Sequence, residues 1–245
     1  MKKIDGWYLP DDEKFFASRI LNSWDPKYER KERINVWRHL LHSDNPKRVA
    51  IDIGSNIGMW SNFLSTFFET VYAFDPSPLV QDCYQKNILD RKINVNFFDV
   101  GLGEFETEEL LNISRSNSGG SSIINKTRES TKINVKTLDS FNILNVDFIK
   151  IDTEGYELPI LKGAIETLKR EKPLVFIEKQ DGARQQELLD FMKDNNAVKL
   201  HDWLRNEIWS FNPEDKEFMT IFGNYKIFKR EYNRIMKEAN SDISK

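Results

Sequence analysis

Short apolar runs that alternate with helical stretches constrain the fold of this chain most strongly. Runs of this kind behave as buried strands, and strands that alternate with helices form right-handed crossovers. The predicted strands are 49–53, 71–74, 95–98, 146–151 and 174–177. The predicted helices are 58–69, 77–90, 158–170 and 187–193. The sequence therefore predicts an α/β protein with a mainly parallel sheet.

The region before the first strand has a different pattern. Residues 11–45 carry apolar side chains at helical spacing, with a break at Pro26, and predict two helices. We therefore divide the chain into an N-terminal helical segment, 1–46, and a main domain, 47–245. The charged stretch 27–38 has two interpretations: a solvated helix face, or a surface that meets an anionic substrate or a partner.

Two later regions also interrupt the alternation. Residues 104–137 contain strand-like pieces at 110–113, 123–124 and 133–135 and predict a β-rich insertion. Its serine- and glycine-rich part, 114–122, is expected to form a mobile lid over the acceptor site. Residues 198–229 are rich in Trp and Phe and predict antiparallel strands.

Composition narrows the class of function. The 245 residues carry a net charge of −3, which disfavours a protein that coats a nucleic-acid backbone. The single Cys83 excludes an internal disulfide and a cysteine-rich zinc site, and it favours a reducing compartment. No secretory signal and no run of about 18 apolar residues is found. We expect a cytoplasmic protein with no membrane segment.

A glycine turn follows the first predicted strand, in the run I-D-I-G-S-N-I-G at 51–58. Open α/β sheets bind nucleotide-like ligands at such a turn. Asn56 and Met59 stand where a dinucleotide fingerprint has its second and third glycines, which argues against NAD or FAD. No phosphate-binding G-x-x-x-x-G-K-[ST] motif is present either. A tight turn without a ligand remains the alternative for the two glycines, Gly54 and Gly58.

Two aspartates end the next two strands. Asp75 is placed to accept hydrogen bonds from both hydroxyls of a ribose, and Pro76 stiffens the turn after it. Asp99 lies where the amino group of an adenine is recognised. A helix cap is the alternative for Asp75, and a generic turn is the alternative for Asp99. A ligand with an adenosine and no pyrophosphate suits this arrangement best.

Charged side chains end the strand predicted at 146–151. Lys150, Asp152 and Glu154 recur at two-residue spacing, so they share one face if the chain is extended. They either orient and deprotonate a substrate hydroxyl or form an internal ion pair that closes the strand end. Glu178 repeats the acidic edge on the next strand. Asp152 and Glu154 also leave Mg²⁺ as an open alternative.

Several residues of the C-terminal part have a chemical and a packing interpretation. His201 is a general base or a partly buried packing residue. Aromatic side chains nearby either stack on a flat substrate such as a sugar ring or pack a terminal hairpin on the sheet. These aromatic residues are Trp203, Trp209 and Phe211.

The glycine turn, together with D-F-I-K-I-D-T-E-G-Y-E-L at 147–158 and L-K-G-A at 161–164, resembles the FkbM family of S-adenosylmethionine-dependent methyltransferases. The resemblance covers about 49–180. It implies a seven-stranded Rossmann-like sheet, S-adenosyl-L-methionine as cofactor, and O-methylation of a hydroxyl on a sugar or another natural product. Asp75 stands where the family often has Glu, a longer acceptor of the same charge.

The motif residues fall into two groups. The expected cofactor-binding residues are Asp52, Gly54, Asn56, Gly58, Asp75, Asp99 and Asp152. The expected catalytic residues are Lys150, Asp152, Glu154 and Glu178. No metal is assigned to them, although Mg²⁺ stays open as stated above.

Two other functions remain open: methylation of a nucleic acid or a protein, and cofactor binding without turnover. Methylation of adenine amino groups typically uses an N/D-P-P-Y/F element after the fourth strand, where this chain has D-T-E-G. The expected acceptor is a small molecule or a glycan, with nucleic acid disfavoured by the acidic balance. The sequence makes no prediction of the oligomeric state.

Overall fold

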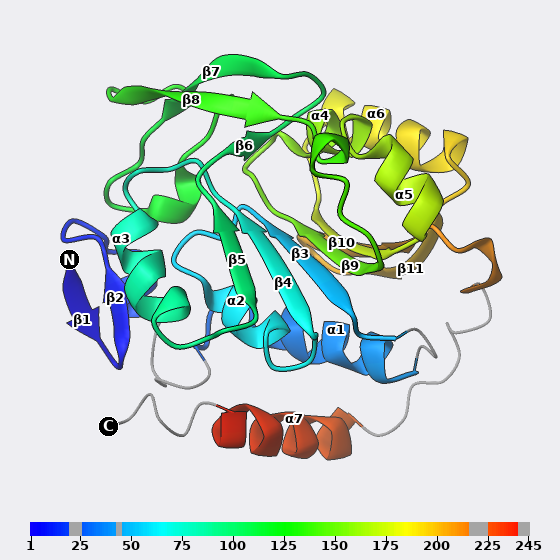
Figure 1. Ribbon diagram of the computed structural model, residues 1–245, viewed down its shortest axis with the longest axis horizontal. Helices are drawn as coiled ribbons and strands as arrows, with labels where there is room; N and C mark the ends of the chain where they lie inside the picture. Colours follow the sequence, from blue (N-terminus) through cyan, green and yellow to red (C-terminus); the bar gives the residue numbers. More distant parts are fainter. Residues whose placement is uncertain (20–25, 43–45, 216–224, 240–245) are drawn as a thin grey trace.

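The computed structural model describes residues 1–19, 26–42, 46–215 and 225–239. The described residues build a central sheet of seven strands in the order β11-β12-β10-β9-β3-β4-β5 (Figure 1). Its strands are β3 (Val49–Ile53), β4 (Thr70–Phe74), β5 (Val95–Phe98), β9 (Val146–Ile151), β10 (Leu174–Glu178), β11 (Val198–Asp202) and β12 (Asn206–Ser210). Within this sheet β12 runs antiparallel to both neighbours, and the other strands run parallel to one another. The predicted Rossmann-like α/β fold is confirmed.

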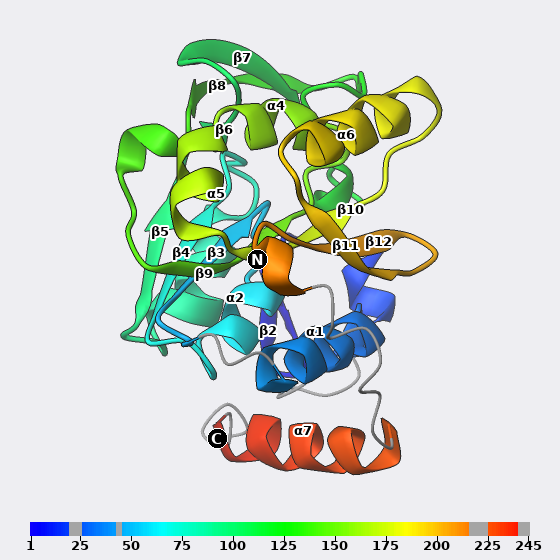
Figure 2. The same ribbon diagram turned by 90° about the vertical axis from the view of Figure 1, so that its right-hand side faces the viewer.

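Helices cover both faces of the sheet (Figures 1 and 2). One face packs against α4 (Glu157–Lys162), α5 (Ile165–Glu171) and α6 (Ala183–Asp194). The other face packs against α1 (Arg30–His42), α2 (Met59–Leu64) and α3 (Gln81–Tyr84), which a π-helical turn (Gln85–Leu89) continues. The last helix, α7 (Tyr225–Ala239), lies outside α1 and buries Tyr232 and Met236 against it.

Strand β9 shows why the central strands are mostly apolar. Phe148 packs into the core under α1 and α2, whereas Ile149 and Ile151 pack into the core under α4, α5 and α6. Successive side chains point to opposite faces, and both faces are covered by helices. A strand in this position therefore needs apolar residues at most places. Asp147, which pairs with Arg48 near the start of the strand, and Lys150, near its end, are the charged exceptions.

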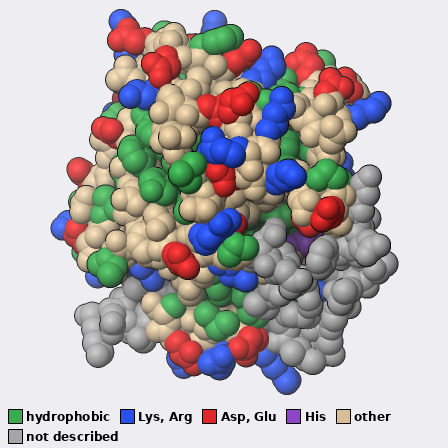
Figure 3. Space-filling view, turned by 45° about the vertical axis from the view of Figure 1, so that its right-hand side comes forward, with side chains coloured by type: hydrophobic (Ala, Val, Ile, Leu, Met, Phe, Trp, Pro, Cys, Tyr) green, Lys and Arg blue, Asp and Glu red, His purple; other side chains and the backbone are tan. Residues whose placement is uncertain are grey.

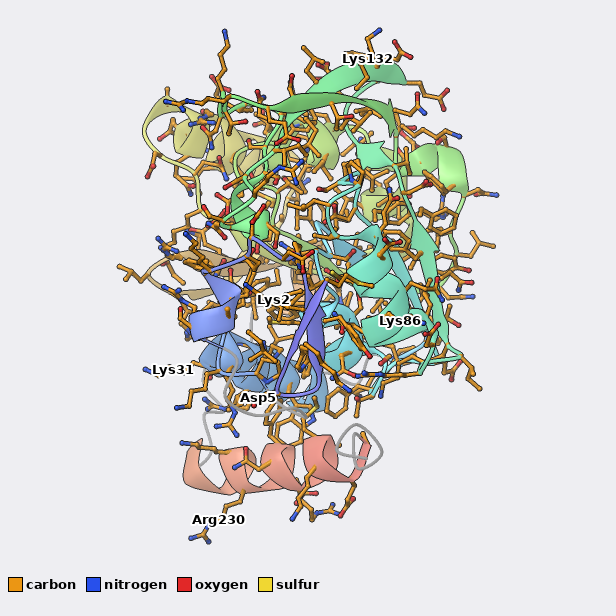
Figure 4. All side chains as sticks on the ribbon, turned by 90° about the vertical axis from the view of Figure 1, so that its left-hand side faces the viewer. Lys2, Asp5, Lys31, Lys86, Lys132 and Arg230 are labelled. Atoms are coloured by element: carbon orange, nitrogen blue, oxygen red, sulfur yellow. The ribbon has the colours of Figure 1, made fainter. Side chains whose placement is uncertain are left out.

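The predicted β-rich insertion forms a second sheet at the end of the main sheet where β5 ends (Figure 1). Its strands are β6 (Gly101–Leu102), β7 (Thr107–Asn112) and β8 (Ser130–Lys136), in the order β6-β8-β7. Leu111, Ile133 and Val135 bury its inner face, while Lys132 extends from β8 into solvent (Figure 4). The pair Ile123 and Ile124, predicted as a strand piece, forms no strand.

The predicted helix over 158–170 is interrupted in the structure. It divides at Gly163 into α4 and α5. A Cβ at Gly163 would lie 1.8 Å from the carbonyl oxygen of Gly103, so only glycine allows this close approach. The turn between the two helices therefore carries the insertion against the main domain. The break explains why a glycine interrupts an otherwise helical pattern.

The N-terminal segment differs most from its prediction. A hairpin of β1 (Lys2–Ile4) and β2 (Trp7–Leu9) opens the chain, turning at Asp5 and Gly6, both at positive φ. A helix over 11–19 is wrong, since only a 3-10 turn (Phe16–Ser18) forms there. The second predicted helix is confirmed as α1.

Other parts of these predictions meet the limits of what the structure describes. Residues 20–25 and 43–45 of the two predicted N-terminal helices lie outside the described residues. In the tail, β11 and β12 confirm the predicted antiparallel strands as far as Ser210. Residues 216–224 lie outside the described residues, and 225–229 belong to α7 instead of a strand.

Candidate active site

A pocket opens at the carboxyl edge of the main sheet, where β3, β4 and β9 end. The space inside it, its open mouth included, is about 940 Å³. The second sheet and the N-terminal segment form two of its walls. Residues from the main sheet and its loops include Gly54, Ser55, Asn56, Asp75, Ser77, Lys150, Asp152 and Glu154. Residues from the other two walls include Phe16, Tyr28, Glu29, Leu111, Ser118 and Ile123.

Lys150 holds the glycine turn against β9. Its Nζ donates to the carbonyl oxygens of Ile53 at 3.0 Å and Gly54 at 2.7 Å, and it pairs with Oδ1 of Asp52 at 3.3 Å. The side chain is only 2% exposed. Burial lowers the pKa of Lys150, but Asp52 and Asp152 outweigh this effect and hold it above its ordinary value. The geometry favours the internal ion pair for Lys150 over a catalytic role.

Asp52 lies behind the pocket and does not line it. Its side chain is fully buried, and its Oδ2 accepts a hydrogen bond from the hydroxyl of Ser61 at 2.6 Å. Because its other oxygen faces Lys150, this carboxylate is committed to the interior. The structure therefore places Asp52 as a support of the turn, out of direct reach of a ligand.

The two glycines of the turn are required by the fold itself. Gly54 has φ +73°, and a Cβ there would lie 1.9 Å from the carbonyl oxygen of Asp152. Gly58 has φ +96° at the start of α2, and a Cβ there would lie 2.2 Å from Ile88. Gly54 lines the pocket, whereas Gly58 does not. Both positions need glycine for the turn and its packing, whether or not a ligand is bound.

Asp75 lies at the end of β4 with both carboxylate oxygens oriented by backbone amides. Asn56 N–H donates to Oδ2 at 2.8 Å, and Ser77 N–H donates to Oδ1 at 2.9 Å. Burial raises the pKa of Asp75 to about 6, against the lowering effect of these two bonds. Each oxygen keeps a lone pair for a ligand, since a carboxylate offers about four acceptor sites.

Ser77 gives a second sign that the pocket is built for a polar ligand. Its side chain is 4% exposed, and among the described residues its hydroxyl has no hydrogen-bond partner. A buried hydroxyl without a partner costs free energy that a bound ligand can recover. Asp75 and Ser77 therefore fit a ligand that presents hydroxyl groups at this end of the pocket.

Asp99 is not brought to this site. Strand β5 ends at Phe98, the Asp99 side chain is exposed, and it does not line the pocket. Its place in the sequence, directly after a strand, was the only basis for its assignment.

Carboxylates gather at the opposite end of the pocket. Asp152 lines it, with Oδ2 at 3.9 Å from Nζ of Lys150. Glu154 lines it too, but φ values of +57° for Glu154 and +109° for Gly155 break the extended alternation predicted for this run. Glu178 ends the adjacent strand β10 just outside the lining. The shared face therefore ends with Lys150 and Asp152.

These carboxylates hold protons more tightly than ordinary ones. Burial, followed by the charge of Asp152, raises the pKa of Glu154 to about 7. Burial and then the charges of Asp152 and Glu154 raise the pKa of Glu178 to about 9. Carboxyl groups that titrate near neutral pH suit proton transfer, and such shifts concentrate at functional sites.

Glu29 joins this cluster, although no pattern in the sequence indicates it. Its Oε2 accepts a hydrogen bond from the indole N–H of Trp60 at 2.7 Å, across 31 positions of sequence. Burial, followed by Asp152, raises the pKa of Glu29 to about 7. It stands in the charged stretch 27–38, whose solvated-face interpretation holds for the exposed Lys31 (Figure 4). No local sequence pattern distinguishes Glu29, which lines the pocket, from the exposed Lys31.

The serine-rich stretch of the insertion closes over the pocket and is tied to both neighbouring walls. The hydroxyl of Ser118 donates to Oδ1 of Asn56 at 3.0 Å. The buried carboxylate of Glu13 accepts hydrogen bonds from the amides of Phe16 and Ser118. The amide of Lys14 donates to Ser116 O at 2.9 Å. The stretch 114–122 is thus hydrogen-bonded to both walls, and its role as a mobile lid stays a prediction.

The C-terminal candidates lie away from the pocket. Trp209 and Phe211 are buried in the core, as their packing interpretation states. His201 packs on Trp203, with ring centres 4.2 Å apart, and neither lines the pocket. Burial lowers the pKa of His201.

Two further properties concern the described part of the chain. It contains no group of three or more His, Cys, Asp or Glu side chains arranged to hold a metal ion, so the Mg²⁺ alternative has no structural support. None of the helices it contains combines the length and the apolar character needed to cross a bilayer.

The strand order of the main sheet and the pocket at its carboxyl edge define the class I methyltransferase fold. The sequence pattern of the family described as "Methyltransferase FkbM domain" matches residues 52–207. The chain belongs to this family.

Individual proteins are similar to this chain. "Methyltransferase 1" of Beauveria bassiana (strain ARSEF 2860) is 26% identical over 185 residues, which cover 62% of this chain and 74% of that protein. The crystal structure of Methyltransferase FkbM from Methylobacillus flagellatus KT matches with a TM-score of 0.51 and 21% identity. That match covers 71% of this chain and 46% of the other, so the chain spans less than half of that protein's length.

A second similar structure comes from Streptococcus mutans. Its description reads "a putative methyltransferase from streptococcus mutans in complex with SAH", and it matches with a TM-score of 0.46 and 13% identity. The match covers 72% of this chain and 96% of that one.

Proposed function

We propose that the protein transfers a methyl group from S-adenosyl-L-methionine to a hydroxyl of a small molecule, such as a sugar or another natural product. One observation carries the proposal. A single pocket joins a hydroxyl-accepting end, at Asp75 and Ser77, to a carboxylate end at Asp152 and Glu154. The first end suits a nucleoside and the second suits an acceptor that must lose a proton.

The residues present fit this cofactor. Asp75 would accept from the ribose hydroxyls, and the turn at Gly54–Asn56 would pass beside the methionine part. The apolar residues Ile57 and Leu102 in the lining provide contact for a flat ring. When bound, the cofactor supplies an electrophilic methyl group on a positively charged sulfur. Asp152, negatively charged and at the pocket edge, favours a cation there.

The carboxylate end indicates the chemistry of the acceptor. An alcohol is a weak nucleophile until its proton is removed, and a carboxyl group with a pKa of about 7, such as Glu154, is suited to take it. Methyl transfer otherwise requires mainly alignment of the reacting atoms. Clustered carboxylates repel phosphates, which argues against a nucleic-acid acceptor. The face in Figure 3 agrees, since acidic and basic side chains are interspersed over it.

Calorimetry with S-adenosyl-L-methionine tests the cofactor assignment. Asp75→Ala should weaken binding about 10- to 150-fold, because hydrogen bonds to a charged group contribute about 1.5–3 kcal/mol. Asp82→Ala is the control, an exposed aspartate on α3 outside the pocket lining, and should bind as the wild type does. Equal affinity of Asp75→Ala and wild type removes Asp75 from the site. Thermal stabilisation by NAD but not by this cofactor contradicts the proposal.

The acceptor is tested with methyl-labelled cofactor and three panels: methyl pyranosides, RNA and peptides. We expect label on a pyranoside oxygen, in a linkage stable to alkali. Label confined to RNA or to peptides would reassign the acceptor while leaving the methyltransferase activity intact.

A further inference from the structure

Two features distinguish Glu29 among the residues that line the pocket. Its backbone has φ +50°, a left-handed conformation that a glutamate adopts at a cost of about 1 kcal/mol. Its carboxylate is fixed by the indole N–H of Trp60, which itself lines the pocket from α2. Strain of this kind persists where the surrounding structure holds it in place.

The hydrogen bond leaves one oxygen of Glu29 available. Trp60 occupies Oε2, and no hydrogen bond within the described residues reaches Oε1. Glu154 has no such orientation, since within the same residues only its backbone oxygen takes part in a hydrogen bond, from Ser122. A general base works best when a third group fixes its direction. Of these two carboxylates, Glu29 is the oriented one.

The charges around Glu29 set its affinity for a proton. Asp152 raises the pKa of Glu29, while the Trp60 hydrogen bond, Lys150 and Arg33 lower it. Tyr28 and Glu178 are two further titratable groups that interact electrostatically with Glu29. Lys150 is already committed to the glycine turn, so it does not occupy the space in front of Glu29.

We propose that Glu29 is a catalytic residue of the methyl-transfer centre, supplied by the segment that precedes the family-matched region. The inference rests on the proposed function. The acceptor hydroxyl gives its proton to Oε1 of Glu29, and the electron pair of the oxygen forms the new O–CH₃ bond. The S–CH₃ bond breaks with its electron pair on sulfur, which gives S-adenosylhomocysteine. Protonated Glu29 then loses its proton to solvent.

A cofactor analogue tests this placement without any acceptor. In the probe, a CH–NH₃⁺ group replaces the methylsulfonium, so its cation lies where the methyl group is transferred. We expect Glu29→Gln to lower the affinity for the amine probe about 10-fold and to leave S-adenosylhomocysteine affinity unchanged. Glutamine keeps an acceptor for the Trp60 indole, which protects the fold. Glu32→Gln, two residues beyond Arg30 on α1 and outside the pocket lining, should change neither affinity.

The ratio of the affinity for the amine probe to the affinity for S-adenosylhomocysteine distinguishes the possible outcomes. An unchanged ratio in Glu29→Gln overturns the role of Glu29, whereas binding of neither ligand by the wild type contradicts the proposed function itself. If Glu29→Gln unfolds, Glu29→Asp provides the second variant, because it keeps the charge and withdraws it from the pocket. A ratio lowered in Glu29→Asp supports the proposal, and a wild-type ratio overturns it.

The turnover rate on a pyranoside that the wild-type enzyme methylates gives a second readout. Glu29→Gln should lose about 100-fold or more in kcat, together with the ionisation near pH 7 in the pH profile. Glu32→Gln should keep both. Wild-type kcat and profile in Glu29→Gln would overturn the inference while the methyltransferase function stands.

Discussion

The glycine turn and the carboxylate cluster line the same pocket, but different forces fix them. The turn is held by backbone geometry: Lys150 bridges two of its carbonyls, and amides orient Asp75. The cluster consists of acidic side chains whose charges repel one another, among them Glu29 and Asp152. The turn is stabilised by hydrogen bonds to its backbone, whereas the cluster stores unfavourable charge.

The difference indicates that cofactor binding and proton transfer depend on different parts of the pocket. A shared cofactor needs one fixed geometry, and backbone hydrogen bonds supply it. Proton transfer needs groups whose pKa lies near the working pH, and burial of like charges supplies those. Variants on the turn should therefore change stability or cofactor affinity, and variants in the cluster should change turnover and pH dependence.

Lys150→Met gives the strongest test of this division. The variant leaves Asp52 fully buried without its charge partner and frees the carbonyls of Ile53 and Gly54. Breaking one side of a buried ion pair costs about 3–5 kcal/mol, so the free energy of unfolding should fall by this amount. Urea unfolding measures it.

The control for this variant is Lys162→Met. Lys162 is 44% exposed and pairs with Glu104 at 3.4 Å, so its loss should change the free energy of unfolding by less than about 0.5 kcal/mol. A Lys150→Met protein of wild-type stability but without turnover would reverse the assignment and make Lys150 catalytic.

The same contrast explains what could be predicted from sequence. The glycine turn, Asp75 and the run ending at Asp152 are local motifs, so their types and spacing were sufficient to locate one side of the pocket. Strand periodicity gave the main sheet because both faces are buried. Asp99 shows the limit, since its position after a strand says nothing about which way its side chain points.

The other wall of the pocket could not be predicted in this way. Glu29 reaches the site through a contact with Trp60, and Glu13 reaches the lid through a contact with Ser118, 105 positions away. Neither contact has a repeat or spacing that marks it. The hairpin Lys2–Leu9 was not predicted because its two strands have only three residues each, too few to show a periodicity, although Asp5-Gly6 is a turn signal.

The hydrogen bonds of the predicted lid, residues 114–122, offer a test whose expected effect is of intermediate size. Glu13→Gln replaces one carboxylate oxygen with an NH₂ group, so either Phe16 or Ser118 loses its acceptor. The closed lid should open more often, by about 10-fold, because a hydrogen bond to a charged group contributes about 1.5–3 kcal/mol. Limited proteolysis should then cut within 114–122 about 10 times faster, and bound cofactor should slow the cut.

Asp12→Asn is the matched control for the lid, since Asp12 is exposed and adjacent in sequence. It should be cut at the wild-type rate. Equal rates in Glu13→Gln and Asp12→Asn would show that the tether does not govern lid opening.

The carboxylate cluster also predicts how stability depends on pH. The pKa of Glu178 is raised to about 9, above the value near 4.3 of an unfolded chain. Between these values the folded protein holds a proton that the unfolded chain has released, so the free energy of unfolding falls as the pH rises. Glu178→Gln removes this effect: it should match wild type near pH 4 and exceed it by about 1 kcal/mol at pH 9, a value reduced by solvent screening. Urea unfolding at several pH values measures the difference, with the exposed Glu187→Gln as control. Parallel curves for wild type and Glu178→Gln would mean that Glu178 is solvated in the folded protein, and the strain of the cluster would then rest on Glu29, Asp152 and Glu154.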